Sequence, residues 1–521
     1  MHQRHIDGLR AVRSERSDTA RPDIVGRLHA GGRLSARERL ALLMDDDSAV
    51  AYGTIAAADT RAASDAPVAD ANGADASSTD STRANATSDV AAAPVTWVAE
   101  TGGVDAFCSI DGQPAIVSST DYTDRGGGYG AARLGRLFAL ARQQRWPLVL
   151  FVDGGGSRAQ HPRAGQRHIE LSGAIGPYTV FDGMAELSGY VPTIAIVSGP
   201  SFAGHASIAG FSDIVIATRG SAIGMGGPPM VEAALGRKLT PQELSSAEMQ
   251  AANGGIELLV DDEPAAIAIA RRCLRFWHVQ DPAWPSSGTG VTARAHPTAA
   301  QIADLVPDSG PYDVRTVLDA LVDDASFLEM RAQFAPALVV GFARIDGHAV
   351  GVIASNPLVD DGIIDELGAQ KIARHVELCD AWELPLLVLV DTAGTRSRWI
   401  ARDGTVTWTP GTSRGHARAL VAHQTRGVPV LSVQLRKGRG IAPALMTGYS
   451  TGASVPALAV AWPTVELDRA DGYALVRDAN AFDDIIEPAA TRTLLARLLR
   501  HLPRDPGSSL RRDKKRPVDS A

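Results

Sequence analysis

Residues 147–153 read PLVLFVD, and residues 385–391 read PLLVLVD. Each stretch is a short apolar run that ends in aspartate, and a glycine-containing turn follows it, GGGSR at 154–158 and TAGTR at 392–396. An apolar run of this length predicts a buried β-strand, and ligand sites in α/β proteins favour the residues just after such strands. The pair therefore predicts two strand-and-turn units, each with a candidate ligand site.

Two further pairs of matching segments surround these runs at almost the same spacing. The apolar runs themselves are 238 residues apart. FCSIDG at 107–112 and FARIDG at 342–347 are 235 apart, and VPTIAIV at 191–197 and VPVLSVQ at 428–434 are 237 apart. Because three matches recur in the same order, we infer that the chain contains a tandem repeat.

The repeat predicts two homologous halves, residues 97–285 and 331–503, joined by a linker over residues 286–330. Within each half, short apolar runs alternate with stretches of helical periodicity. This alternation is typical of α/β architecture with helical crossovers between strands. We therefore expect two α/β halves of the same design.

Three segments flank or interrupt the halves. Residues 1–55 are predicted to be an N-terminal helical segment, because Ser35 and Glu38 in GGRLSARERLALLMDD form a capping box before an apolar stripe. Residues 56–96 are almost entirely Ala, Ser, Thr, Asp and Gly, which predicts a disordered insert. The basic residues 504–521 are predicted to be a disordered tail.

The composition excludes several classes of protein. With 521 residues, 45% hydrophobic and 21% charged, the chain can form a large folded core. Its net charge of -8 argues against nucleic-acid binding through overall basicity. Residues 187–212 lack Asp, Glu, Lys and Arg, but glycine and proline interrupt them, so they predict buried strands and turns and no membrane span.

Cysteine and histidine give no metal or redox pattern. The three cysteines, Cys108, Cys273 and Cys379, match neither a zinc ribbon nor a CxxC motif. The thirteen histidines are scattered, and His205 is interpreted as an ordinary polar position. Because the N-terminus is polar and contains no signal peptide, we expect a cytoplasmic protein with reduced thiols and no metal.

Glycine-rich turns are the candidate sites, since a glycine lets backbone N–H groups approach an anion closely. The first half contains DGGGSR at 153–158, AGHA at 203–206 and GMGGPP at 224–229, and the second contains RKGRG at 436–440. Each could equally be a purely structural turn. A solvated basic pair is the plain alternative for Arg436 and Lys437.

Two other kinds of site are disfavoured. No Walker A or GxGxxG motif marks a nucleotide site. GYSTG at 448–452 matches the nucleophile elbow of serine hydrolases, which needs a strand before the serine and a helix after it. Here a helix-like segment precedes the motif and a strand-like segment follows it, so the motif does not predict a hydrolase.

Together these segments resemble the carboxyltransferase subunit of biotin-dependent acyl-CoA carboxylases, the family of acetyl- and propionyl-CoA carboxylase β chains. The resemblance runs from residue 31 to about residue 478, apart from the insert. It is carried by STDYTDRGGGYG at 119–130, FVDGGGSR at 151–158, IATRGSAIGMGGPPMVE at 216–232, VVGFARIDGHAVGVIASNPL at 339–358, KIARHVELCDAWELPLLVLVDTAG at 371–394 and VAWPT at 460–464. It implies tandem crotonase-like (ClpP/crotonase) domains, each a spiral of ββα repeats.

The resemblance also implies a reaction. A carboxyl group passes from carboxybiotin, held by a separate carrier protein, to the α-carbon of an acyl-CoA. Anions form on both reactants and need backbone donors more than acid–base side chains, since the released biotin anion is thought to take the α-proton. The first half is expected to bind acyl-CoA and the second half carboxybiotin.

Site residues follow from this resemblance by position. The oxyanion donors are expected to be Gly155 and Gly156 on the acyl-CoA side and Ile441 and Ala442 on the carboxybiotin side. Substrate binding is expected from Gly154, Arg158, Ala203, Gly204, Gly226 and Gly227. Carboxybiotin binding is expected from Gly394, Arg436, Lys437, Gly438 and Gly440.

Partners follow in the same way. A biotin carboxylase and a biotin carboxyl carrier protein are implied as separate chains, because the sequence contains neither a biotinylation site nor an ATP-grasp segment. A homo-oligomer is implied, at least a dimer and usually a hexamer. No nucleic-acid or membrane partner is expected.

The second half departs from the family pattern. TAGTRSRW at 392–399 replaces a Pro-Gly-bearing loop, Ile441 replaces a glycine, and Pro443 lacks a backbone donor beside the expected oxyanion hole. These departures leave two alternatives open. One is a biotin-independent crotonase-like enzyme such as an acyl-CoA decarboxylase, and the other is a noncatalytic paralogue within a carboxylase complex.

Overall fold

The chain was studied as a computed structural model. The structure describes residues 2–15, 17–52, 55–57, 97–99, 103–123, 126–127, 131–155, 180–277, 299–396, 398–400, 406–408, 412–448, 457–467, 482–502 and 518. Most of the expected disordered insert (56–96) and tail (504–521) lies outside these residues, as do Gly156 and Arg158.

The first half is built on a seven-stranded sheet with the strand order β1-β4-β5-β6-β7-β9-β11. Its strands are β1 (Val50–Tyr52), β4 (Gly103–Ile110), β5 (Gln113–Thr120), β6 (Leu148–Phe151), β7 (Thr193–Val197), β9 (Ile214–Thr218) and β11 (Leu258–Val260). The pairs β1–β4 and β4–β5 are antiparallel, and the remaining neighbours are parallel. The helices between its strands are α4 (Ala131–Gln144), α5 (Val180–Leu187) and α6 (Gly204–Phe211), and α10 (Glu263–Leu274) follows β11.

The second half repeats this design. Its main strands are β12 (Leu328–Met330), β13 (Leu338–Ile345), β14 (His348–Ser355), β15 (Leu386–Thr392), β18 (Val430–Gly438), β19 (Leu458–Ala461) and β21 (Asp484–Ile485), in that order across the sheet, and β20 (Glu466–Leu467) pairs with β18. The first two pairs are again antiparallel and the rest parallel. Helices α13 (Glu366–Ala381), α14 (Thr412–Thr425) and α15 (Ala442–Thr447) connect them. The expected α/β architecture is confirmed.

The remaining elements lie around these sheets. The helices are α1 (His2–Glu15), α2 (Pro22–Ala30), α3 (Ala36–Leu43), α7 (Pro228–Leu235), α8 (Pro241–Ser245), α9 (Ala247–Ala252), α11 (Ala299–Asp304), α12 (Val314–Leu321) and α17 (Thr491–His501). Short strand pairs are β2 (Ile55–Ala57) with β3 (Trp97–Ala99), β8 (Pro200–Phe202) with β10 (Ala222–Gly224), and β16 (Arg398–Ile400) with β17 (Val406–Trp408).

The repeat extends further than the sequence matches indicated. In the first half α3 precedes β1, and Asp45 accepts hydrogen bonds from the backbone N–H groups of Asp111 and Gly112 in the turn between β4 and β5, at 2.9 and 2.7 Å. In the second half α12 precedes β12, and Asp323 accepts the N–H groups of Asp346 and Gly347, both at 2.8 Å. Each half therefore begins with a helix, an aspartate that caps the β-hairpin, and an edge strand.

This finding corrects two expected boundaries. The described part of the 286–330 linker contains α12 and β12, which belong to the second sheet, and the fully buried apolar face of α12 packs into its core. The 1–55 segment likewise contributes β1 to the first sheet. The sequence comparison missed this repeat because the two copies share mainly apolar positions and one aspartate, and because residues 56–96 change the spacing in the first half only.

The expected capping box is confirmed at the start of α3, where Ser35 Oγ accepts the Glu38 N–H at 3.1 Å and Glu38 accepts the Ser35 N–H at 2.8 Å. The face of α3 that follows is buried and consists of Ala36, Arg39, Leu40 and Leu43. A charged side chain therefore points from an otherwise apolar helix face into the first half.

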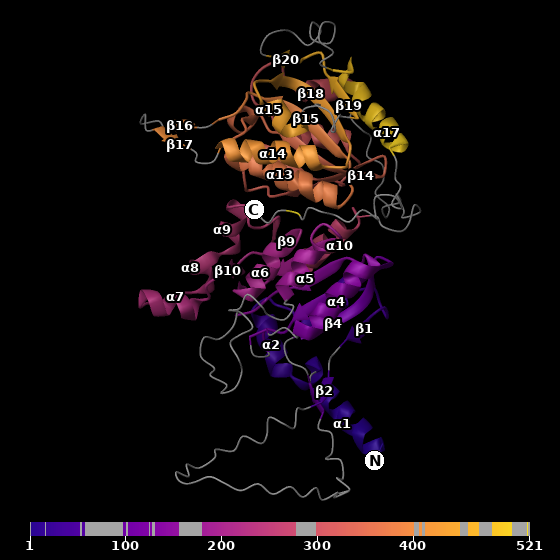
Figure 1. The fold of residues 1–521 in the computed structure, drawn as a ribbon, viewed down its shortest axis with the longest axis vertical. Helices are drawn as coiled ribbons and strands as arrows, with labels where there is room; N and C mark the ends of the chain where they lie inside the picture. The colour runs from indigo at the N-terminus through magenta and orange to yellow at the C-terminus, as the bar shows by residue number, and fades with distance from the viewer. Residues whose placement is uncertain are drawn as a thin grey trace, which may run out of the picture.

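The two halves stack along the long axis of the molecule (Figure 1), with α13 on the side of the second half that faces the first. One apolar core is continuous between them, since buried residues of both sheets, such as Phe151 and Phe342, belong to the same cluster. Glu257 of the first half pairs with Arg374 on α13 at 2.9 Å and with Arg331 at 3.0 Å. Burial alone would raise the pKa of Glu257, but the charges of these arginines lower it below its ordinary value.

Candidate functional site

The turn after β6 is fixed by the carboxylate that ends the apolar run. Asp153 is fully buried, and its Oδ1 accepts the backbone N–H groups of Ser198 and Gly199, both at 3.0 Å. Thr120 Oγ1 donates to the Asp153 carbonyl oxygen at 2.8 Å. These bonds tie the turn at Gly154 to the ends of β5 and β7, which places it at the carboxyl edge of the parallel strands.

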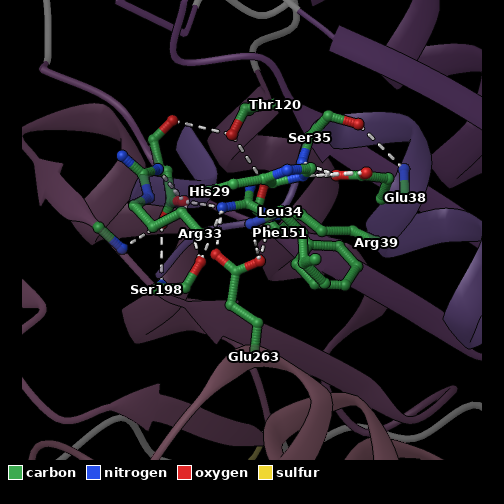
Figure 2. Close-up of polar contacts among 12 residues, drawn as sticks. His29, Arg33, Leu34, Ser35, Glu38, Arg39, Thr120, Phe151, Ser198 and Glu263 are labelled. Carbon is green, nitrogen blue, oxygen red and sulfur yellow. Dashed lines mark hydrogen bonds and ion pairs between the residues drawn. The ribbon is translucent and has the colours of Figure 1, made fainter. Parts of the chain in front are cut away.

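Two arginines from the N-terminal segment hold this carboxylate. Arg39 Nη2 lies 2.6 Å and Arg33 Nη2 lies 2.8 Å from Asp153 Oδ2. Arg39 also contacts Glu263 at 2.7 Å and donates to Ser198 Oγ at 2.8 Å, and Figure 2 shows how these side chains meet. Burial would raise the pKa of Asp153, but the charges of Arg39 and Arg33 and the Ser198 N–H lower it to about 2. The carboxylate is therefore ionised at neutral pH.

Close packing around this turn requires the absence of side chains at Gly154 and Gly127. A Cβ on Gly154 would lie 2.2 Å from the His205 ring, and a Cβ on Gly127 would lie 2.5 Å from the Asp153 carbonyl oxygen. A Cβ on Gly227 would lie 3.5 Å from the Gly155 carbonyl oxygen. The turn, the start of α6 and the segment before α7 are thus brought together as expected.

The backbone of this region is already hydrogen-bonded in part. Gly154 N–H donates to the Pro200 carbonyl at 2.7 Å, and Gly154 accepts the Phe202 N–H at 2.9 Å, so the turn pairs with β8. Gly155 N–H donates to the Gly126 carbonyl at 3.0 Å. A role for the Gly155 amide as an oxyanion donor therefore requires this bond to be exchanged.

Ala203 has a strained backbone at the entrance of α6. Its φ of 52° and ψ of -119° lie in a region that glycine favours and other residues avoid, and its N–H donates to the Gly224 and Met225 carbonyls at 3.0 and 3.1 Å. The helix begins at Gly204, and the first N–H groups of any helix have no partner within it and carry partial positive charge. This geometry suits a negatively charged ligand atom near Gly204.

His205 packs beside the same turn. Its side chain is buried, and the burial lowers its pKa despite hydrogen bonds with the Gly127 and Phe202 backbone and the nearby charge of Asp153. The imidazole is therefore neutral at neutral pH. His205 was interpreted from the sequence as an ordinary polar position, and the structure places its ring against Gly154.

The second half has a comparable turn after β15. Gly394 follows this strand with a φ of 123°, and its carbonyl accepts the Ile364 N–H at 3.0 Å. Thr392 pairs with Gly438 in the sheet, and its carbonyl accepts the Arg439 N–H at 3.3 Å. The turn and the end of β18 are therefore adjacent.

The helix α15 begins directly after this strand end. Gly440 has a φ of 60°, Ile441 is the residue that caps α15, and Ala442 is its first residue. Pro443 within the first turn has no N–H, so the amides of Ile441 and Ala442 at the helix start are followed by a position without a donor. The five expected residues of the carboxybiotin side other than Arg436 and Lys437 thus lie around one strand–turn–helix junction.

Both basic residues of this region have partners within the protein. Arg436 is 1% exposed, its Nε lies 3.1 Å from Asp391 Oδ2, and it donates to the Pro307 and Gly310 carbonyls at 2.7 and 2.9 Å. Lys437 forms an ion pair with Asp361 at the wall of a pocket of about 480 Å³. Arg436 is thus committed to the interior, and contact with a ligand anion would require breaking these bonds.

The chain is similar in sequence and structure to known proteins. A family model described as the carboxyl transferase domain matches residues 80–468. The chain belongs to the carboxyl transferase family. This carboxyl transferase is 30% identical over 467 residues to the propionyl-CoA carboxylase beta chain of Saccharopolyspora erythraea, covering 85% of this chain and 76% of the relative.

Solved structures agree with the family. A crystal structure of transcarboxylase 12S, a hexamer assembly with methylmalonyl-coenzyme A and methylmalonic acid bound, has a TM-score of 0.69 and 27% identity, covering 92% of this carboxyl transferase and 91% of that chain. A single-chain, multi-domain long-chain acyl-CoA carboxylase has a TM-score of 0.74 and 29% identity, and the match covers 95% of this chain but 48% of that one. The expected family and tandem crotonase-like fold are confirmed.

Sequence reasoning missed several residues of this carboxyl transferase. Arg39, Arg33 and Glu263 hold the first turn, and Tyr312 donates to Asp391 Oδ2 at 2.9 Å in the second. One signal was present for Arg39, because it falls on the apolar face of α3 between Ala36 and Leu43. No comparable signal marked Tyr312, which follows a proline in a segment interpreted as linker.

Three other kinds of feature can be assessed in the described part of the chain: a metal site, a membrane-spanning helix and a nucleophile elbow. There, no group of three or more His, Cys, Asp or Glu side chains could hold a metal ion. No helix within the same residues has the length and apolarity needed to cross a membrane. α15 precedes the GYSTG motif and β19 follows it, so the strand and helix required around a nucleophile elbow stand in the opposite order.

Proposed function

We propose that this chain is the carboxyltransferase component of an acyl-CoA carboxylase, which transfers a carboxyl group from carboxybiotin to the α-carbon of an acyl-CoA. The observation that carries the proposal is the convergence of Gly154–Gly155, the start of α6 and Gly226–Gly227 at the carboxyl edge of the first sheet. Backbone groups at this edge would face the expected ligand. The proposal also draws on the propionyl-CoA and acyl-CoA carboxylases that the chain resembles.

The first half would bind the acyl-CoA. We assign its thioester to the space beside Gly154, Ala203, Gly204, Gly226 and Gly227. Arg158, which lies outside the described residues, would contribute a positive charge to substrate binding. Gly155 and Gly156 would donate backbone hydrogen bonds to the thioester oxygen as negative charge develops on it. One such donor typically contributes about 3 kcal/mol to the transition state.

The second half fits carboxybiotin by the same physical argument. A Cβ on Gly440 would meet nothing within 4 Å, so there is open space beside this glycine, and the Ile441 and Ala442 amides follow it at the start of α15. Gly394 follows β15, and Gly438 ends the adjacent strand β18. Carboxybiotin supplies the carboxyl group, and this chain contributes the two amides, which would hold the oxygen of the biotin ring. Arg436 and Lys437 would support the turn through Asp391 and Asp361.

Partner chains complete the proposal. A biotin carboxyl carrier protein would present carboxybiotin, and a biotin carboxylase would charge it. We also propose a homo-oligomer, at least a dimer and by analogy with the 12S assembly a hexamer. The apolar surface beside Gly226–Gly227 supports this, because Met225, Met230 and Leu235 are 68%, 62% and 59% exposed on and before α7 at the periphery of the first half (Figure 1).

A reconstitution assay tests the function. The purified chain is mixed with a bacterial biotin carboxylase, its carrier protein, ATP, labelled bicarbonate and a series of acyl-CoA esters. We expect labelled carboxyl groups in the product of at least one ester, and none without the carrier. No carboxylation of any ester, while a known carboxyltransferase works with the same partners, would contradict the proposal. Decarboxylation of malonyl-CoA without biotin would instead favour a biotin-independent enzyme.

A further inference from the structure

We propose that Arg39 is a positioning residue of the acyl-CoA side: it holds the Asp153 carboxylate, and through it the backbone turn at Gly154–Gly155, in the geometry that binds the thioester. This inference rests on the proposed function for the chemistry of the site. It adds an assignment for a residue of the N-terminal segment, far in sequence from every glycine of the turn.

The guanidinium of Arg39 has a fixed position in the protein interior. Arg39 is 2% exposed and lies between two carboxylates, with N–O distances of 2.6 Å to Asp153 and 2.7 Å to Glu263. Its Nε also donates to Glu263 Oε2 at 3.2 Å. The planar group is thereby fixed at both ends, which a flexible lysine could not reproduce.

The Asp153 carboxylate is linked by hydrogen bonds to the backbone of the turn at Gly154. The oxygen of Asp153 that Arg39 does not contact, Oδ1, accepts the N–H groups of Ser198 and Gly199 at 3.0 Å each. These residues precede β8, and β8 pairs with Gly154 through the Pro200 and Phe202 backbone. A displacement of the carboxylate would therefore move both sides of the turn.

The other charged residues around Asp153 belong to the same buried cluster as Arg39. Arg33 also contacts Asp153, and its side chain occupies the place where a Cβ on Gly199 would stand, 2.7 Å from Arg33 Cζ. Glu263 in turn accepts the Leu34 N–H at 2.9 Å, which anchors the segment that carries both arginines. The two arginines and two carboxylates balance in charge, so the loss of Arg39 leaves a net negative charge buried beside the turn.

The described contacts of the Arg39 side chain are with Asp153, Glu263, Ser198 and the Phe151 ring, all within the protein interior. Arg39 would act through Asp153, whose last backbone atoms begin the turn. A misplacement of about 1 Å in a catalytic turn can lower the rate about 100-fold. We therefore expect a substitution of Arg39 to lower the turnover of acyl-CoA through displacement of the turn, without any contact between Arg39 and the reacting atoms.

The test compares Arg39→Met and Arg39→Lys with Arg374→Met in the full-length protein. Arg374 is a matched control, since it is also a buried arginine paired with a carboxylate, Glu257, but lies between the two halves. Two readouts are taken: amide hydrogen exchange in peptides covering residues 150–155 and 196–203, and steady-state kinetics with acyl-CoA and carrier protein varied separately.

We expect Arg39→Met to accelerate exchange in both peptides and to lower kcat/KM for acyl-CoA about 100-fold, with the KM for the carrier unchanged. Arg39→Lys should recover part of this loss. Arg374→Met should lower thermal stability to a similar degree without either local effect. Unchanged exchange and a kcat/KM within about twofold of wild type for Arg39→Met would overturn the proposal.

The outcome is separable from failure of the proposed function. If the wild-type protein carboxylates no acyl-CoA with competent partners, the proposed function fails while the exchange comparison still decides whether Arg39 positions the turn. If Arg39→Met does not fold, Arg39→Lys carries the comparison, and wild-type exchange rates in its turn peptides would then contradict the positioning role.

Discussion

Asp153 ends the apolar run of β6 in the first half and Asp391 lies at the matching place in β15 of the second. Both are fully buried, and both accept backbone N–H groups from the end of the next strand in the sheet, from Ser198 and Gly199 in one half and from Lys437 in the other. The cations that balance them come from different parts of the chain. The two halves therefore share the turn geometry but not its electrostatic support.

The residue that supplies the positive charge beside the aspartate differs between the two halves. At the place of Arg39 in α3, the corresponding helix α12 carries Val317. In the second half the cation is Arg436 at the end of β18, which at the 237-residue spacing of these strands matches Gly199 in the first half. Both arrangements place arginine beside the aspartate, so the duplicated halves differ in sequence here while keeping the same turn.

This difference in the neighbouring arginines shifts the pKa of the two aspartates in opposite directions. Two arginines outweigh burial at Asp153 and lower its pKa to about 2. At Asp391 burial is the larger effect, and the charge of Arg436 with the Tyr312 hydrogen bond does not compensate for it, so the pKa is raised. The first turn is thus held by a firmly ionised carboxylate, and the second by one whose charge is less favourable.

The largest expected effect comes from Gly154 compared with Gly440. Gly154→Ala places a Cβ 2.2 Å from the His205 ring, whereas Gly440→Ala meets nothing within 4 Å and is disfavoured only by its φ of 60°. We expect Gly154→Ala to lower turnover at least about 100-fold, and Gly440→Ala to cost about 1 kcal/mol of unfolding free energy.

Steady-state kinetics and chemical denaturation measure this pair. Gly210→Ala is the control, because Gly210 lies within α6 where a Cβ meets nothing, and it should retain activity. Equal tolerance of alanine at 154 and 440 would refute the difference in packing between the turns.

The second prediction concerns the neutral variants of the two aspartates. Asp153→Asn leaves Arg39 and Arg33 buried with less compensation, and breaking a buried pair in this way typically costs about 3 to 5 kcal/mol. Asp391→Asn removes a charge that is already unfavourable, and we expect a loss of about 1 kcal/mol or less. Urea denaturation of both variants at neutral pH decides between this order and a reversed or equal one.

The third prediction is a difference in pH dependence. The Asp153 charge contributes stability above its ordinary pKa of 3.8, and this contribution is lost as the pH falls toward about 2. The raised pKa of Asp391 means that its charge costs stability at neutral pH, and the cost disappears as the pH falls.

Denaturation curves from neutral pH down to about pH 2 therefore distinguish the aspartates, because the Asp391 difference changes as the pH falls toward 3.8 and the Asp153 difference changes below it. The stability of wild type relative to Asp153→Asn should shrink as the pH falls, and that of wild type relative to Asp391→Asn should grow. Slopes of the same sign would show that the two carboxylates experience similar surroundings.

The smallest difference between the halves is expected where their structures agree. Asp45 and Asp323 each accept two N–H groups of a β-hairpin turn, and each also pairs with an arginine, Arg271 or Arg492. We expect Asp45→Ala and Asp323→Ala to cost about 1 to 2 kcal/mol each, equal within error. Differential scanning calorimetry of the two variants would reveal any asymmetry at this position.

The sequence predicted what depends on local pattern. The strands of both halves are continuous apolar runs because both faces of a parallel sheet are buried, so β6, β7, β15 and β18 were found with their turns. The expected glycines also came together, since glycine at a close approach leaves a visible signature. The capping box of α3 was likewise readable.

Other features depend on contacts between distant segments. α12 and β12 were interpreted as linker because their resemblance to α3 and β1 lies in apolar positions without a motif. Arg39 and Tyr312 were missed because their partners, Asp153 and Asp391, lie more than 70 residues away in the chain. The hydrogen bond from Gly155 to Gly126 is a backbone contact that no residue type could reveal.

In the proposed function the first-half turn binds the acyl-CoA and the second-half turn does not. Amide hydrogen exchange of the full-length protein, with and without a saturating acyl-CoA ester, distinguishes the two turns and needs no partner protein. We expect protection at residues 154–155, 203–206 and 224–227, with unchanged exchange at 392–394 and 438–442. Protection of the second set without the first would show that the acyl-CoA binds at the second-half turn instead.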